Sequence, residues 1–209
     1  MGTQIEKVFE ILNDWRLLPN YQLERRADIF FALYLPEIIN QNKQKFGIEI
    51  TYDNIIPEFP LRKGTIFPKE NIDKPNQSVK VDYAVITSSK VIFIELKTDN
   101  NSVNQDQIDY LEKAKEAKFT HLIEGVRLIE EKTKQKKKYK HLLEKLDEFD
   151  LSTEKEIGIV YILPQEDELL KKKEIPMITF AEVIEAIKGN KDELTRHFIE
   201  SLKKWQTQI

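Results

Sequence analysis

The 209-residue chain contains no cysteine, which excludes disulfide bonds, thiol catalysis and cysteine-ligated zinc. Its three histidines are scattered along the sequence and show no metal-ligand spacing. Only six glycines are present, and none forms a glycine-rich phosphate loop, so the sequence encodes no nucleotide-driven motor. The protein is therefore neither a thiol enzyme, nor a cysteine-ligated zinc protein, nor a nucleotide-driven motor with a glycine-rich phosphate loop.

Long hydrophobic runs are also absent. The two longest, residues 29–35 and 157–163, are far shorter than the roughly 20 residues of a membrane helix. The N-terminal stretch carries acidic residues where a secretion signal is apolar, so we expect a cytoplasmic protein with no membrane partner. A net charge of −3 argues against a protein wrapped all over by nucleic acid, although it is compatible with a local basic patch.

Hydrophobic periodicity and proline positions predict alternating helices and strands. The expected helices cover 3–18, 22–35 (with Pro36 marking its end or a restart into the following residues), 103–118, a segment beginning with Thr120 as N-cap, and a C-terminal segment with a capping box at Asn190 and Glu193. The expected strands lie near 48–56, in a hairpin over 79–98, and at 156–163 and 175–180. This order predicts a mixed α/β layered fold.

The hairpin carries three charged residues, Asp82, Glu95 and Lys97, where a buried strand is normally apolar. With Ser88 and Ser89 in the turn, Asp82 lies directly opposite Glu95, with Cβ atoms about 5 Å apart. Lys97 follows Glu95 by two residues and therefore points to the same face. The other positions on both faces are apolar, which is typical of a central strand pair covered on two sides.

Two neighbouring carboxylates in an apolar setting repel each other and lose solvation, at several kcal/mol if uncompensated. A divalent cation such as Mg²⁺ would compensate them, and a nearby lysine could hold or deprotonate an attacking water. This arrangement suits phosphodiester hydrolysis. The alternative interpretation is a hairpin at the surface edge of a sheet, whose three charges only form solvated ion pairs.

The segments VDYAV (81–85) and IELKTD (94–99) resemble the signature of the PD-(D/E)xK nuclease superfamily. The resemblance implies a restriction-endonuclease-like α-β-β-β-α-β core with a mixed central sheet flanked by helices, plus extra N- and C-terminal helices. It implies a single nuclease-like domain over 1–209. Its parts are a core at about 22–165, a helical insertion at about 119–149, and C-terminal strand and helices at 175–207.

The same resemblance assigns residue roles. Asp82, Glu95 and the backbone carbonyl of Leu96 would bind Mg²⁺ or Mn²⁺, and Lys97 would be the catalytic lysine. Many members add a glutamate on the first core helix, and Glu24 is the candidate here, although an acid at a helix start is also favoured by the helix dipole alone.

Exonuclease-like relatives carry a Gln and a Tyr on the helix after the lysine strand, and Gln107 and Tyr110 resemble that pair. Their i, i+3 spacing puts them on one face, although the gap to the lysine is one residue shorter than usual. The alternative for both is a plain position on the helix surface.

A basic run at 132–141 includes Lys136, Lys137, Lys138 and Tyr139. The lysines could contact phosphates and the tyrosine could stack on a base, whereas the alternative is a solvated or disordered helix junction.

Taken together, the hairpin charges and the resemblance predict a Mg²⁺- or Mn²⁺-dependent deoxyribonuclease, with RNA a less favoured substrate. The resemblance also allows a homodimer. The alternatives are a catalytically silent nucleic-acid-binding or scaffolding module of the same fold, and an α/β domain of unrelated function.

Overall fold

A single five-stranded sheet connects the elements of the chain in the computed structural model, which describes residues 2–69 and 76–207. Its strand order is β1-β2-β3-β4-β5. The first three strands are antiparallel neighbours, and β4 and β5 are parallel. Their bounds are β1 Ile55–Arg62, β2 Ser78–Ile86, β3 Lys90–Leu96, β4 Glu156–Leu163 and β5 Met177–Thr179. The predicted mixed α/β sheet with flanking helices is confirmed at this level.

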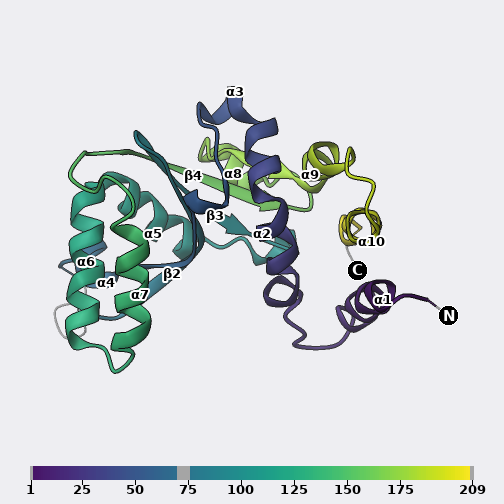
Figure 1. The fold of residues 1–209 in the computed structure, drawn as a ribbon, viewed down its shortest axis with the longest axis horizontal. Coiled ribbons are helices and arrows are strands. Elements are labelled where there is room, and N and C mark those ends of the chain that lie inside the picture. The colour runs from purple at the N-terminus through teal and green to yellow at the C-terminus, as the bar shows by residue number, and fades with distance from the viewer. Residues whose placement is uncertain (1, 70–75, 208–209) are drawn as a thin grey trace. The chain divides into compact units, whose positions relative to one another are not determined.

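Apart from the turn between β2 and β3, each connection between these strands contains an α-helix, and α-helices also occupy the two ends of the described chain (Figure 1). Before β2 they are α1 Gln4–Trp15, α2 Leu23–Gln41, α3 Lys43–Phe46 and α4 Lys63–Ile66. After β3 they are α5 Gln105–Glu116, α6 Phe119–Lys132, α7 Lys136–Leu146, α8 Glu168–Lys172, α9 Phe180–Ile187 and α10 Glu193–Trp205. Short 3₁₀ turns, η1 Tyr52–Asn54 and η2 Asn100–Ser102, precede β1 and α5.

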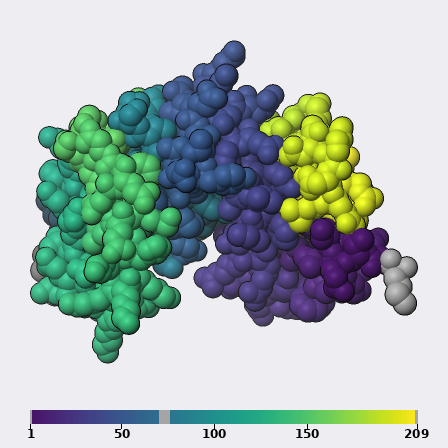
Figure 2. Space-filling view, in the orientation of Figure 1, coloured from purple at the N-terminus to yellow at the C-terminus, as the bar shows by residue number. Residues whose placement is uncertain are grey.

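The chain divides into two compact units. The first comprises the chain up to Tyr52, the segment Leu96–Val103 and the chain from Val160 onward. Within it, α1 lies against α10, as the adjoining purple and yellow surfaces in Figure 2 show. The side chain of Asn13 joins these two helices, because it donates a hydrogen bond to Ser201 Oγ and accepts one from the indole of Trp205. Aromatic rings around Phe198 fill the core of this unit.

The second unit comprises Asp53–Glu95 and Asn104–Ile159. In it α6 packs against β1 and α4, and α6 and α7 lie side by side (Figure 1). Gly125 permits the close approach of α6, because a Cβ at this position would lie 2.7 Å from Thr65 Oγ1. The predicted helical segment 119–149 corresponds to α6 and α7.

The prediction that the helix ends or restarts at Pro36 was wrong, because α2 continues through this residue to Gln41 as one helix. A proline inside a helix removes one backbone hydrogen bond and costs about 3 kcal/mol. The continuation buries Ile38 and Ile39 completely. Because each fully buried isoleucine contributes about 1.5–3 kcal/mol, their burial offsets the penalty of the proline.

The strand predicted near 48–56 was also wrong, because β1 begins only at Ile55 and contains Pro57 and Pro60. β1 stands at the end of the strand order, where proline is tolerated because a missing N–H can face away from the sheet. Glu58, between the two prolines, has a φ of 52° and breaks the extended backbone there. An edge strand can thus have a sequence that resembles a loop.

The predicted N-cap at Thr120 was wrong because α6 begins at Phe119. The carboxylate of Glu154 accepts hydrogen bonds from the Phe119 backbone N–H, at 2.6 Å, and from the Thr120 hydroxyl, at 3.2 Å. A residue more than 30 positions away thus satisfies the start of the helix, and local sequence signals do not reveal it.

The predicted capping box at Asn190 and Glu193 was wrong as well. Asp192 caps α10, accepting the Thr195 N–H at 2.9 Å. Asn190 instead donates to Glu37 at 2.9 Å. A capping box is present at the start of α9, between Thr179 and Glu182.

Candidate functional site

The β2–β3 hairpin adopts the predicted register. Tyr83 pairs with Ile94 and Ala84 with Phe93, and the turn closes with a 2.8 Å hydrogen bond from Thr87 N–H to the Lys90 carbonyl. The pairing ends at Tyr83 with Ile94, and the next residues along the two strands are Asp82 and Glu95. In the sheet order β2 lies between β1 and β3, and β3 lies between β2 and β4, so Asp82 and Glu95 both stand on interior strands.

Glu95 is almost completely buried, with 1% of its surface exposed. Lys97 is 5% exposed, whereas Asp82 is partly accessible. The interpretation of the hairpin as a surface feature with solvated charges is therefore wrong for Glu95 and Lys97. Burying an ionised group costs several kcal/mol unless hydrogen bonds or charges compensate it. The groups around these two side chains must therefore compensate their charges.

Two side chains of α5 hold the Glu95 carboxylate. Asn104 caps the helix by accepting the Gln107 backbone N–H at 2.9 Å, which fixes the first turn beside β3. Gln107 Nε2 donates to Glu95 Oε2 at 2.5 Å, and the Tyr110 hydroxyl donates to Oε1 at 3.1 Å. The i, i+3 spacing thus presents both donors to one carboxylate, and neither residue is a plain surface position.

The environment of Tyr110 raises the pKa of its hydroxyl far above the ordinary value. Burial is the largest cause, followed by the negative charge of Glu95, with a further contribution from Asp82. Both carboxylates therefore act on the same phenol. Because Tyr110 stays protonated, it serves as a hydrogen-bond donor and not as a base.

One buried polar atom of this cluster has no partner among the described residues. Gln107 Oε1 is buried and accepts no hydrogen bond, since its amide nitrogen is turned to Glu95. A water molecule bound to a cation would supply the missing donor, and Mg²⁺ retains several waters when carboxylates hold it. Asp82, Glu95 and this orphaned acceptor thus fit a hydrated Mg²⁺ or Mn²⁺. Within residues 2–69 and 76–207, no group of three or more His, Cys, Asp or Glu side chains is arranged to bind a metal.

In the first unit, Lys97 forms an ion pair with Glu24. Lys97 Nζ lies 3.6 Å from Glu24 Oε2, and the Lys97 backbone N–H donates to the Ile162 carbonyl at 2.8 Å. Glu24 stands in the first turn of α2 and is about one-third exposed. The structure thus gives the predicted helix glutamate a specific partner beyond the helix dipole.

For the other predicted site residues, the structure shows their position and burial. Leu96 is the buried last residue of β3. Lys136, Lys137 and Lys138 form the exposed first turn of α7, in the second unit. Tyr139 is half-buried and lines a cavity of about 280 Å³ together with Gln77 and Lys132. The basic run is thus helical from Lys136 onward, and its contact with nucleic acid stays a prediction.

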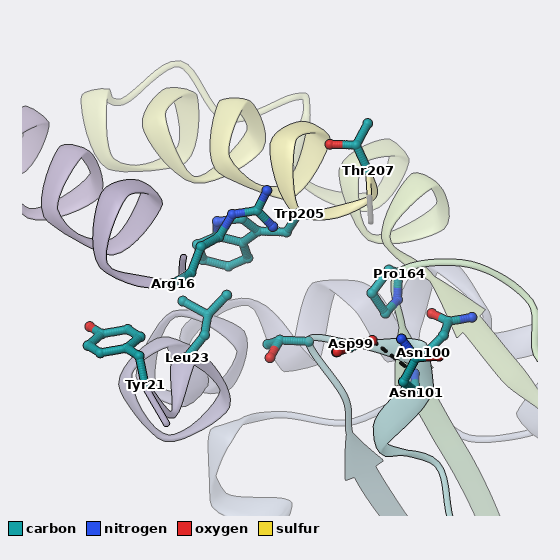
Figure 3. A pocket seen from close by; sticks show the side chains of 10 residues that line it. Arg16, Tyr21, Leu23, Asp99, Asn100, Asn101, Pro164, Trp205 and Thr207 are labelled. Carbon is teal, nitrogen blue, oxygen red and sulfur yellow. Dashed lines mark hydrogen bonds between the residues drawn. The ribbon is translucent and has the colours of Figure 1, made fainter. Parts of the chain in front are cut away.

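Sequence reasoning missed a pocket in the first unit, shown in Figure 3. Its walls come from the end of α1, the loop before α2, the turn after β3 and the end of α10. These segments are far apart in the sequence, so no motif connects them. The one available signal was Asp99, which directly follows the IELKT segment.

No helix in the described part of the chain combines the length and hydropathy required to cross a membrane. No family model, curated protein or solved structure compared with this chain matches it.

Proposed function

We propose that the protein is a divalent-metal-dependent nuclease that hydrolyses phosphodiester bonds of DNA, and that its core is restriction-endonuclease-like. The order α2, β1, β2, β3, α5, β4 supports the core assignment, because it is the α-β-β-β-α-β order that the resemblance implies. The α6–α7 pair would then be an insertion between the last helix and the last strand of that core.

The observation that carries the proposal is the Glu95 carboxylate with its two donors. Gln107 and Tyr110 are neutral, so they orient this carboxylate without cancelling its negative charge. A carboxylate held in a defined direction beside a second acid is what a cation site requires, and such supporting hydrogen bonds orient the ligands of metal sites. Mere stabilisation of the fold would be served at least as well by an apolar residue at this position.

The proposed roles follow from the chemistry of each group. Asp82, Glu95 and the Leu96 carbonyl would hold Mg²⁺ or Mn²⁺. When bound, such a cation polarises a phosphate oxygen and lowers the pKa of a bound water. Lys97 carries a positive charge that can orient the attacking water and counter the charge developing on the phosphate. Glu24 would position the Lys97 ammonium through their ion pair.

The test is a cleavage panel of labelled single-stranded, duplex and branched DNA and of RNA, with Mg²⁺, with Mn²⁺ or with EDTA. We expect cleavage of DNA that requires the metal and is lost in Asp82→Asn. The matched control is Asp109→Asn, which changes an exposed acid of α5 and should retain activity.

Two results would overturn the proposal. One is the absence of cleavage on every substrate with either metal, and the other is full activity of Asp82→Asn. Absence of both cleavage and millimolar Mg²⁺ binding would favour the silent binding or scaffolding module.

A further inference from the structure

The pocket of the first unit has a volume of about 180 Å³ and walls of differing chemistry. Figure 3 shows Arg16 and Trp205 together on one side and Asp99 and Asn101 on another, with Tyr21 at a third position. One wall is thus cationic and aromatic, and the facing wall offers a carboxylate and an amide. A ligand that satisfies both must combine a negative group with hydrogen-bonding edges.

Arg16 is the cation of this pocket. Its guanidinium donates to the Lys204 carbonyl at 2.9 Å, which anchors it at the end of α10. It forms no ion pair with a carboxylate of the described residues. Burial lowers the pKa of Arg16, yet an arginine stays protonated in a protein. A partly desolvated guanidinium of this kind is suited to an anion, and phosphate matches its fork of donors.

Hydrogen bonds hold the facing wall. Asp99 Oδ1 accepts the Asn101 N–H at 2.9 Å, and the Asn100 amide is fixed to the backbone of Gln165. The Asn101 amide and the Thr98 hydroxyl make no hydrogen bond within the part of the chain that the structure describes. They remain able to donate to a ligand. Together with the Asp99 carboxylate they offer both donors and acceptors, as the edge of a nucleobase requires.

Aromatic side chains complete the pocket. Trp205 is 2% exposed, and its indole N–H is held by Asn13 at 2.8 Å, so its position is fixed. Tyr21 is half-buried and in edge contact with Trp15. An aromatic ring beside a cation and a polar edge is the usual construction of a site for an unpaired base.

The pocket is also lined by chain neighbours of the two residues that form the Lys97–Glu24 ion pair of the same unit. Thr98 and Leu23, which line the pocket, are the chain neighbours of Lys97 and Glu24. Adjacent Cα atoms are only about 3.8 Å apart. A ligand in the pocket would therefore contact the residues that directly adjoin Lys97 and Glu24 in the chain.

We propose that this pocket binds one unpaired nucleotide of the substrate strand, with its phosphate on Arg16 and its base between Tyr21 and the Asp99–Asn101 edge. This inference rests on the proposed nuclease function and specifies its substrate as a strand that is single-stranded beside the cleavage site. A base in a duplex would first have to unpair and unstack, at a few kcal/mol.

The first experiment measures binding in EDTA, where no cleavage occurs. The probes are a deoxynucleoside monophosphate, the corresponding nucleoside and inorganic phosphate, and the readout is calorimetry together with tryptophan fluorescence. We expect the monophosphate to bind more tightly than either fragment. Arg16→Ala and Tyr21→Ala should each weaken it about 10- to 100-fold, whereas the control Arg25→Ala, an exposed arginine of α2, should not.

Inorganic phosphate binding as tightly as the monophosphate, with no effect of Tyr21→Ala, would overturn the nucleotide assignment. Because Arg16→Ala also removes a contact to α10, thermal unfolding is recorded in parallel and Tyr21→Ala provides the independent variant. Failure of the nuclease proposal and failure of the nucleotide-pocket proposal give different results. Metal-dependent cleavage without nucleotide binding would overturn the pocket assignment alone. Nucleotide binding without cleavage would overturn the nuclease, and with it the assignment of the nucleotide to a cleaved strand, and would leave the pocket as a nucleotide-binding site.

Discussion

The Tyr110 hydroxyl donates to one oxygen of Glu95 at 3.1 Å, and Gln107, one helical turn earlier, donates to the other oxygen at 2.5 Å. Helix α5 thereby determines the orientation of a carboxylate on β3. Glu95 and helix α5 belong to the second unit, so this relationship depends on the packing of that unit only.

Gln107→Ala should weaken Mg²⁺ binding about 10- to 100-fold, because supporting hydrogen bonds of this kind orient a metal-binding carboxylate. The matched control is Gln105→Ala, which changes a glutamine on the exposed side of the same helix, where it bonds Asp109. Isothermal titration calorimetry or competition with Mn²⁺ measures the affinity. An affinity equal to that of the unmodified protein would contradict the role of Gln107.

Tyr110→Phe should alter the stability profile at high pH. The folded-state pKa of Tyr110 is raised, so the contribution of its protonated hydroxyl is fully present below the unfolded pKa of about 10 and is lost as pH rises further. The difference in unfolding free energy between the unmodified protein and the variant should therefore shrink above pH ~10, by up to ~1.4 kcal/mol per pH unit. Urea unfolding of both proteins at about pH 8 to 11, on either side of the unfolded pKa of about 10, measures this difference in unfolding free energy. A constant difference would show that Tyr110 is not perturbed.

Lys97→Met should reduce kcat/KM for DNA cleavage by about 10²–10⁴, the range for a group that takes part in proton transfer. Methionine retains most of the buried aliphatic stem, so a folded protein is expected, and thermal unfolding checks this. The control is Lys90→Met, at the opposite end of β3, where the lysine forms an ion pair with Glu156 at 3.3 Å. Unchanged kinetics in Lys97→Met would refute the assigned role.

Gly125→Ala should destabilise the protein by about 1 kcal/mol. Alanine favours helix by up to ~1 kcal/mol over glycine, but overpacking costs about 1–3 kcal/mol, and the new Cβ would lie 2.7 Å from Thr65 Oγ1. The same change in a Thr65→Ala background should cost less. Gly189→Ala, whose Cβ would meet no atom within 4 Å, is the control. Denaturant unfolding that shows Gly125→Ala to be as stable as the unmodified protein would rule out this tight contact.

Local sequence patterns were sufficient where structure depends on near neighbours. The alternation of side chains and a tight turn determined the hairpin register, and the prediction for Tyr83 and Ala84 holds. The same rule makes Asp82 and Glu95 neighbours. Helical periodicity put Gln107 and Tyr110 on one face, since residues three apart are adjacent on any α-helix.

Where long-range contacts decide, the sequence was insufficient. Burial of Ile38 and Ile39 carries α2 through Pro36, and the position of β1 at the end of the sheet accommodates its two prolines. Glu154 supplies the start of α6 from a distant part of the chain. In each case a tertiary interaction outweighs a local preference of a few kcal/mol.

The sequence by itself thus determined which charged residues stand on the hairpin and which side chains share a helix face. Both follow from the regular alternation of side chains along a strand and from the regular turn of a helix. Only the tertiary structure decided that Glu95 is held by α5, that Lys97 is paired with Glu24, and that Arg16, Tyr21 and Asp99 line one pocket. Those contacts join residues from separate elements. Their geometry is set by how apolar faces pack, which no local pattern of residues contains.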